Sequence, residues 1–105
     1  MDPEHAWERR EKVQLLDIRE DWEWRAGHID SSLHIPMTGL SQRQDEIAED
    51  RLVVCVCRSG NRSAMVARAL ARAGYDAENL DGGVQAWKAS GFPLVTPDGK
   101  PGEVA

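Results

Sequence analysis

Apolar residues form a few short runs between longer polar stretches. The strongest run, residues 52–56, has five consecutive apolar and mostly β-branched positions, which predicts a central strand buried on both faces. Residues 13–18 form a second apolar run that ends in charge and predict another buried strand. One of the short segments at residues 28–29 and 33–36 is expected to be an edge strand, closed by Pro36.

Helices are predicted between these strands. Residues 63–73 give the clearest pattern, with small residues around most of the circumference and a single charged stripe, so this helix should lie close to the sheet. Asp2 suits an N-cap, and Gly27 suits the left-handed position after a helix. Residues 77–80 predict a further parallel strand, and the alternation of strands and helices indicates a parallel α/β sheet covered on both faces. The remaining helices are expected over residues 3–12, 20–26, 38–50 (one or two surface helices) and 84–90.

Composition narrows the class of protein. The chain has 105 residues, enough for one domain, which we place at residues 1–95 with a loose tail at 96–105. A net charge of −5 argues against general nucleic-acid binding. No apolar run approaches the roughly 18 residues of a membrane span, and two cysteines do not make a disulfide framework. We therefore expect a cytoplasmic protein that binds neither nucleic acid nor membrane.

The candidate chemistry lies directly after the central strand. Cys57 ends the apolar run, and a short loop with a glycine and two basic residues connects it to the next helix. Backbone N–H groups of such a loop can converge on an anion, either the thiolate of Cys57 or a substrate. An ordinary thiol with a pKa of roughly 8.5 is mostly protonated at neutral pH, so the loop amides would have to lower that pKa. The loop residues are Arg58, Ser59, Gly60, Asn61, Arg62 and Ser63.

The alternative interpretation is that Cys57 is merely a small buried residue at a strand end. It leaves unexplained why Arg58 and Arg62 stand inside a tight loop after a buried strand. Cys55 is expected to face away from Cys57 and to act as a core hydrophobic residue, with a resolving thiol as a minor alternative.

Six motifs follow one another along the chain: Leu15-Leu16-Asp17-Ile18-Arg19, Glu23-Trp24 with Gly27-His28-Ile29, Ile35-Pro36, the loop from Cys57 to Ser63, Leu80-Asp81-Gly82-Gly83 with Ala86-Trp87, and Gly91-Phe92-Pro93-Leu94. In this order they resemble the single-domain rhodanese (thiosulfate sulfurtransferase-like) family over most of residues 3–94. That resemblance implies a rhodanese-like α/β fold with a small parallel sheet of four to five strands, because the family's short first strand is not evident here.

The resemblance implies a sulfurtransferase that works by a ping-pong mechanism through a persulfide on Cys57, without metal or organic cofactor. The donor would be a small sulfur-containing anion such as thiosulfate, bound by the loop residues 58–63, and the acceptor a thiophile such as cyanide, a thiol or a protein. A non-catalytic or regulatory rhodanese-like module that binds a partner protein is the alternative.

Loop length separates this chemistry from that of related enzymes. Phosphatases of similar architecture place five residues between the cysteine and an arginine, whereas Arg62 comes one residue early here and Ser63 occupies that position. Phosphatase or arsenate chemistry is therefore less favoured. Asp17 and Arg19 follow the strand at residues 13–18 and are expected to lie beside the loop, where we favour an ion pair that supports it over contact with substrate.

Overall fold

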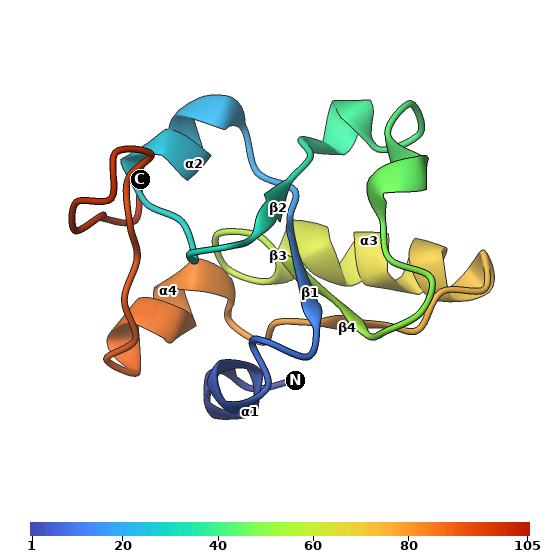
Figure 1. Cartoon of the computed structure of the whole chain (residues 1–105), viewed down its shortest axis with the longest axis horizontal. Coiled ribbons are helices and arrows are strands. Elements are labelled where there is room, and N and C mark those ends of the chain that lie inside the picture. Colours follow the sequence, from blue (N-terminus) through green and yellow to red (C-terminus); the bar gives the residue numbers. More distant parts are fainter.

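The computed structural model describes all residues 1–105. Four parallel strands form one sheet in the order β2-β1-β3-β4 (Figure 1). The strands are β1 (Gln14–Asp17), β2 (Leu33–His34), β3 (Val53–Val56) and β4 (Ala77–Asn79). The helices are α1 (Pro3–Glu8), α2 (Asp21–Ala26), α3 (Asn61–Arg72) and α4 (Gly83–Ala89), with the 3-10 turns η1 (Met37–Gly39) and η2 (Gln44–Glu46). The predicted parallel α/β sheet is confirmed, with four strands.

The two faces of the sheet carry separate hydrophobic clusters. Val54 and Val56 of β3 pack on the side covered by α1 and α4, and Val53 and Cys55 pack on the side covered by α3. The four side chains of β3 are all buried, so the strand is covered on both faces of the sheet, as the unbroken apolar run predicts. The β1–β3 register pairs Asp17 with Val56, which brings the segments that follow these strands to one edge of the sheet.

The prediction that Cys55 faces away from Cys57 is wrong. Both side chains belong to the same cluster on the α3 side of the sheet. Positions i and i+2 of a strand share a face, so the period of two itself indicates this arrangement. Neither cysteine forms a disulfide.

Two predicted helices are shorter than the hydrophobic pattern indicates. The first helix begins with the Asp2 cap, whose carboxylate accepts from the His5 amide, but it ends at Glu8 rather than near residue 12. A turn closed by Val13 N–H on the Arg9 carbonyl redirects the chain, because Val13 has to enter the core ahead of β1. Residues 38–50 form only η1 and η2, because few apolar side chains anchor this polar stretch.

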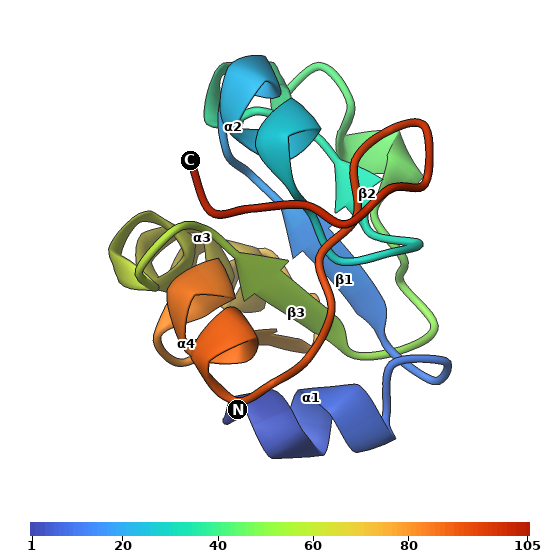
Figure 2. The same cartoon turned by 90° about the vertical axis from the view of Figure 1, so that its left-hand side faces the viewer.

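The predicted loose tail at 96–105 is instead held against the domain. Gly102 N–H donates to the Leu94 carbonyl at 2.8 Å, and Glu103 N–H donates to the Ala26 carbonyl at 2.9 Å. The C-terminal segment consequently returns to the end of α2, as both ribbon views show (Figure 1, Figure 2). Gly27 makes this approach possible: its φ of 172° is extended rather than left-handed, and a Cβ there would lie 2.6 Å from the Glu103 nitrogen.

Candidate active site

The Cys57 thiol lies at the carboxyl end of β3 inside a closed loop. Its side chain is fully buried, and α3 starts four residues later at Asn61. Gly60 provides the N-cap of α3 with a φ of +95°, a left-handed conformation that glycine adopts without strain. This turn directs successive backbone N–H groups toward the sulfur.

Three donors converge on the sulfur atom of Cys57. The Gly60 amide lies 3.0 Å from Sγ, the Ser63 amide 3.4 Å and the Ser63 hydroxyl 3.2 Å. Hydrogen bonds to a thiolate are charge-assisted, so such a set stabilises the ionised form more than the thiol.

The pKa values of the two cysteines shift in opposite directions, because only Cys57 receives these hydrogen bonds. Burial raises the pKa of the Cys57 thiol, but hydrogen bonds from Ser63, Gly60 and Ser59 outweigh it and leave the pKa of Cys57 below its ordinary value. Cys55 has no such donors, so burial, together with the nearby charge of Cys57, raises the pKa of Cys55 to about 12. The thiolate form is therefore more accessible at Cys57 than at Cys55, which lies in the core.

The two loop arginines take different partners. Both terminal nitrogens of Arg62 donate hydrogen bonds to the Glu23 carboxylate, each at 3.0 Å, and these bonds link the start of α3 to α2. Glu23 is 5% exposed and also accepts from the Glu20 amide in a capping box. Arg58 is exposed and donates its Nε to the Ala105 carbonyl at 2.8 Å. The remaining predicted binding residues, Ser59 and Asn61, are exposed on the outside of the loop.

Asp17 and Arg19 form a fully buried ion pair at the end of β1. Arg19 donates to both Asp17 oxygens at 2.8–3.1 Å and also to the carbonyls of Glu23 and Gly27. This pair holds α2 in place, and its connection to the loop runs through Glu23 and Arg62. Both charged groups bind protein partners and are buried, so this geometry suits an ion pair that supports the loop and α2 rather than one that contacts substrate.

Two residues of the site were not anticipated from the sequence. Asn79 at the end of β4 contacts both the Ser63 hydroxyl and the Gly60 carbonyl. The position of Asn79 in the sequence could have indicated this role, since a polar residue that ends a parallel strand lies at the same edge of the sheet as Cys57. Gly83 lies against the carbonyls of Cys57 and Arg58, and no local pattern in the sequence indicates that contact.

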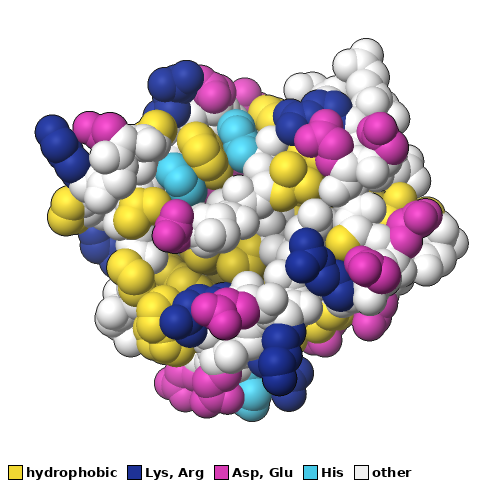
Figure 3. Space-filling model, in the orientation of Figure 1, with side chains coloured by type: hydrophobic (Ala, Val, Ile, Leu, Met, Phe, Trp, Pro, Cys, Tyr) yellow, Lys and Arg dark blue, Asp and Glu magenta, His cyan; other side chains and the backbone are white.

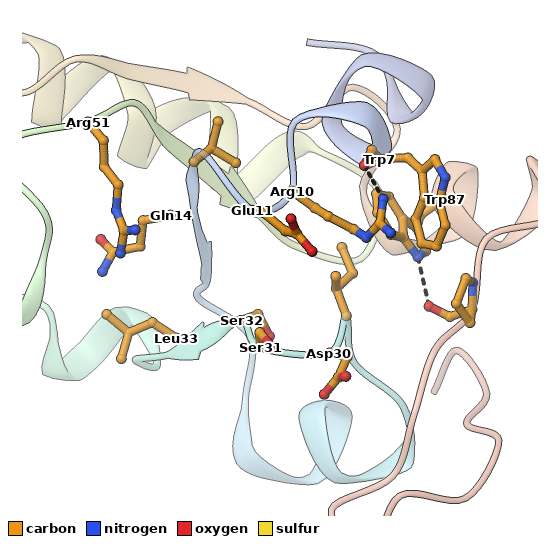
Figure 4. Close-up of a pocket in the computed structure, with 13 residues that line it drawn as sticks. Trp7, Arg10, Glu11, Gln14, Asp30, Ser31, Ser32, Leu33, Arg51 and Trp87 are labelled. Carbon is orange, nitrogen blue, oxygen red and sulfur yellow. Dashed lines mark hydrogen bonds between the residues drawn. The ribbon is translucent and has the colours of Figure 1, made fainter.

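The largest cleft of the molecule is elsewhere. It has a volume of about 710 Å³, and hydrophobic side chains line its floor beside charged groups at the rim (Figure 3). Trp7, Arg10 and Trp87 lie on one side and Arg51 on the other (Figure 4), and the Arg10 guanidinium covers the Trp7 ring at 3.7 Å. No residue of the Cys57 loop lines it. The Gly60 and Ser63 amides and the Ser63 hydroxyl, which surround Cys57 Sγ, are called the cradle below.

No group of three or more histidine, cysteine or acidic side chains is placed to hold a metal ion. None of the helices has the length and apolar character needed to cross a membrane.

Comparison with known proteins identifies the family. A family model described as the rhodanese-like domain matches residues 2–90. This chain belongs to that family. The matched residues include Cys57 and the loop that follows it.

Relatives of this rhodanese-like chain support sulfur transfer as its general activity. It is 43% identical over 90 residues to a sulfurtransferase of Allochromatium vinosum, covering 85% of this chain and 84% of that protein. It is 35% identical over 86 residues to the putative sulfurtransferase YtwF of Bacillus subtilis, covering 82% and 84% of the two chains. The crystal structure of a rhodanese-related protein from Thermoplasma volcanium superposes with a TM-score of 0.86 at 29% identity, covering 90% of this chain and 95% of that one.

Proposed function

We propose that this protein is a thiosulfate sulfurtransferase-like enzyme that carries sulfane sulfur as a persulfide on Cys57. The observation that carries the proposal is the convergence of the Gly60 amide, the Ser63 amide and the Ser63 hydroxyl on one buried sulfur atom. Donors fixed before the reaction stabilise an anionic sulfur without reorganisation.

In the first half-reaction the Cys57 thiolate attacks the outer sulfur of the donor. With thiosulfate the step is Cys57–S⁻ + S–SO₃²⁻ → Cys57–S–S⁻ + SO₃²⁻. The S–S bond of thiosulfate breaks, a new S–S bond forms on Cys57, and sulfite leaves with the bonding electron pair. The thiolate required for this attack is the form that the loop donors favour.

In the second half-reaction a thiophile attacks the outer sulfur of the persulfide, and Cys57 leaves as a thiolate. The same loop donors stabilise that returning charge, so one cradle serves both steps. Cyanide, a low-molecular-weight thiol or a protein thiol fits the chemistry of the acceptor, and these residues require no resident cofactor for the reaction.

Loop composition supports sulfur chemistry over phosphate chemistry. Arg62 stands five residues after Cys57, one short of the phosphatase spacing. Its guanidinium faces Glu23 rather than an open pocket, so a dianionic phosphate group would have to compete with a carboxylate at 3.0 Å. We propose that residues 58–63 bind the donor chiefly through their backbone amides.

Intact-mass measurement after incubation with thiosulfate tests the proposal. One added sulfur atom is expected on the wild type, absent in Cys57→Ala and retained in the matched control Cys55→Ala. Addition of cyanide should return the wild type to its starting mass and release thiocyanate. If neither thiosulfate nor an organic persulfide adds sulfur, the enzyme proposal fails, and the alternative of a non-catalytic partner-binding module is favoured.

A further inference from the structure

The Ser63 hydroxyl lies between two acceptors. Its oxygen is 3.2 Å from Cys57 Sγ and 2.5 Å from Asn79 Oδ1. A serine hydroxyl has one hydrogen to donate. It can therefore stabilise the Cys57 thiolate or bind Asn79, but it cannot do both at once.

The orientation of the Asn79 amide is fixed by its second contact. Asn79 Nδ2 donates to the Gly60 carbonyl at 3.1 Å, and that carbonyl can only accept. Turning the amide over would place Oδ1 against the Gly60 oxygen with no hydrogen between these two acceptors. The oxygen of Asn79 therefore faces Ser63.

We propose that Asn79 is a positioning residue that controls, through Ser63, how strongly the Cys57 thiolate is stabilised. While Cys57 is protonated, the hydrogen bonds form a continuous chain in which Sγ–H donates to the Ser63 oxygen and Ser63 donates to Asn79. Once Cys57 ionises, the Ser63 hydroxyl has to turn from Asn79 to the sulfur. Asn79 thus favours every state in which Sγ carries no charge.

This inference rests on the proposed persulfide function and extends it. When sulfur is loaded, the negative charge moves from Sγ to the outer sulfur, and the Ser63 hydroxyl is free to return to Asn79. Asn79 therefore favours the loaded form over the free thiolate. The other charged groups near Cys57 are Arg62, which is paired with Glu23, and Arg58, which binds the Ala105 carbonyl. The buried Asp17–Arg19 pair lies at the end of β1, and all these groups stay unchanged in the variants below.

The pH dependence of Cys57 alkylation by iodoacetamide measures the coupling in four proteins: wild type, Ser63→Ala, Asn79→Ala and the double variant. Loss of the hydroxyl in Ser63→Ala should raise the pKa of Cys57 by about 1 unit. Asn79→Ala should lower it by about 0.5–1 unit, because Ser63 then serves the thiolate alone. In the Ser63→Ala background the Asn79 substitution should have no effect on this pKa.

If Asn79→Ala shifts the pKa of Cys57 equally with and without the Ser63 hydroxyl, Asn79 acts through the Gly60 carbonyl instead, and the proposal is overturned. The proposal is also overturned if Asn79→Ala shifts this pKa in neither protein. Asn79→Asp provides a second variant that keeps the acceptor oxygen and adds negative charge. The pKa of Cys57 in this variant should equal or exceed that of the wild type, and a lower value would contradict the proposed competition.

Intact mass at a fixed ratio of thiosulfate to sulfite reports the effect on loading. At a pH above the pKa of Cys57, where the free protein is a thiolate, Asn79→Ala should reduce the ratio of loaded to free protein about threefold to tenfold. An unchanged or higher ratio contradicts the role in loading. The alkylation experiment involves no sulfur donor. A missing sulfur adduct in the wild type therefore defeats the proposed function alone, whereas missing coupling defeats this inference alone.

Discussion

Gly83 is the residue at which one added methyl group should test the cradle most directly. It begins α4 with a φ of +60°, and a Cβ there would overlap the Cys57 carbonyl oxygen and lie 2.6 Å from the carbonyl carbon and oxygen of Arg58. The atoms in the way are backbone and cannot rotate aside. The next two amides, Val84 and Gln85, donate to those same carbonyls at 2.9 and 3.1 Å. Gly83→Ala must therefore displace the Cys57 loop or detach it from α4.

The expected cost has two parts that a matched control separates. Placing alanine at positive φ costs about 1–2 kcal/mol at any site. Forcing a methyl group against packed atoms costs about 1–3 kcal/mol more. Gly91, which follows the other end of α4 with a φ of +89°, has no atom within 4 Å of an added Cβ, so Gly91→Ala carries only the first cost. The difference of about 1–3 kcal/mol corresponds to roughly 5–20 °C in Tm for a domain of this size.

Thermal unfolding followed by circular dichroism, together with the pH profile of Cys57 alkylation, measures both consequences. Gly83→Ala should unfold at a lower temperature than Gly91→Ala and should raise the pKa of Cys57, because the displaced amides no longer reach the sulfur. Equal Tm values for the two variants, with an unchanged Cys57 profile, would refute the view that α4 holds the loop through these carbonyls.

Three further predictions concern the charges and thiols of the site. Burial raises the pKa of Glu23, but hydrogen bonds from Arg62 and the Glu20 amide leave it lowered. The carboxylate therefore stabilises the fold fully above its unfolded pKa of about 4.3, and this stabilisation is lost as the pH falls through the lower folded pKa. Urea titrations should show Glu23→Gln less stable than the wild type by about 1–2 kcal/mol at pH 7, with equal stabilities in acid. A difference in stability that does not change with pH would contradict the pairing. Maleimide at pH 7 should label the folded chain once, at Cys57, and a second label on native protein would contradict the raised pKa of Cys55. Because Arg62 pairs with Glu23 and links the loop to α2, Arg62→Ala should displace the loop and lower kcat/KM for thiosulfate by about tenfold, and Arg62→Lys, which keeps a charge for Glu23, by less. Equal kinetics in the three proteins would exclude a role for this ion pair.

The sequence predicts best what depends on local patterning. The apolar run of β3 and the small-residue face of α3 are recoverable because burial imposes its period directly on the residues that carry it. The position of Cys57 between them follows from the same two elements. The end of α1 and the irregular stretch around η1 and η2 are harder to predict from the sequence, because they depend on where the chain has to enter the core rather than on local helix preference.

Contacts between distant segments lie beyond such patterns. Arg62 and Glu23 are 39 residues apart, and the loop arginine looked available for substrate until its partner on α2 was known. The tail composition of proline, glycine and charge indicates a loose end, yet Gly27 and Gly102 let two backbones approach closely enough to fix it. Glycine signals a close approach as readily as a turn, and only the tertiary structure distinguishes the two.

The loop can direct its amides inward because its carbonyls are satisfied from outside. The Cys57 and Arg58 carbonyls accept from the first amides of α4, which a helix start leaves without internal partners. The Gly60 carbonyl accepts from the Ala64 amide of α3 as well as from Asn79, so it keeps a donor when Asn79 is replaced. The Arg58 carbonyl shares its peptide group with the Ser59 amide, one of the donors that lower the pKa of Cys57. A peptide group whose oxygen is bound outward presents its N–H on the opposite side, so the contact with Gln85 orients the Ser59 amide before any sulfur arrives. Substitutions that detach the Cys57 and Arg58 carbonyls from α4 should consequently alter the Cys57 thiolate, as substitutions inside the loop do.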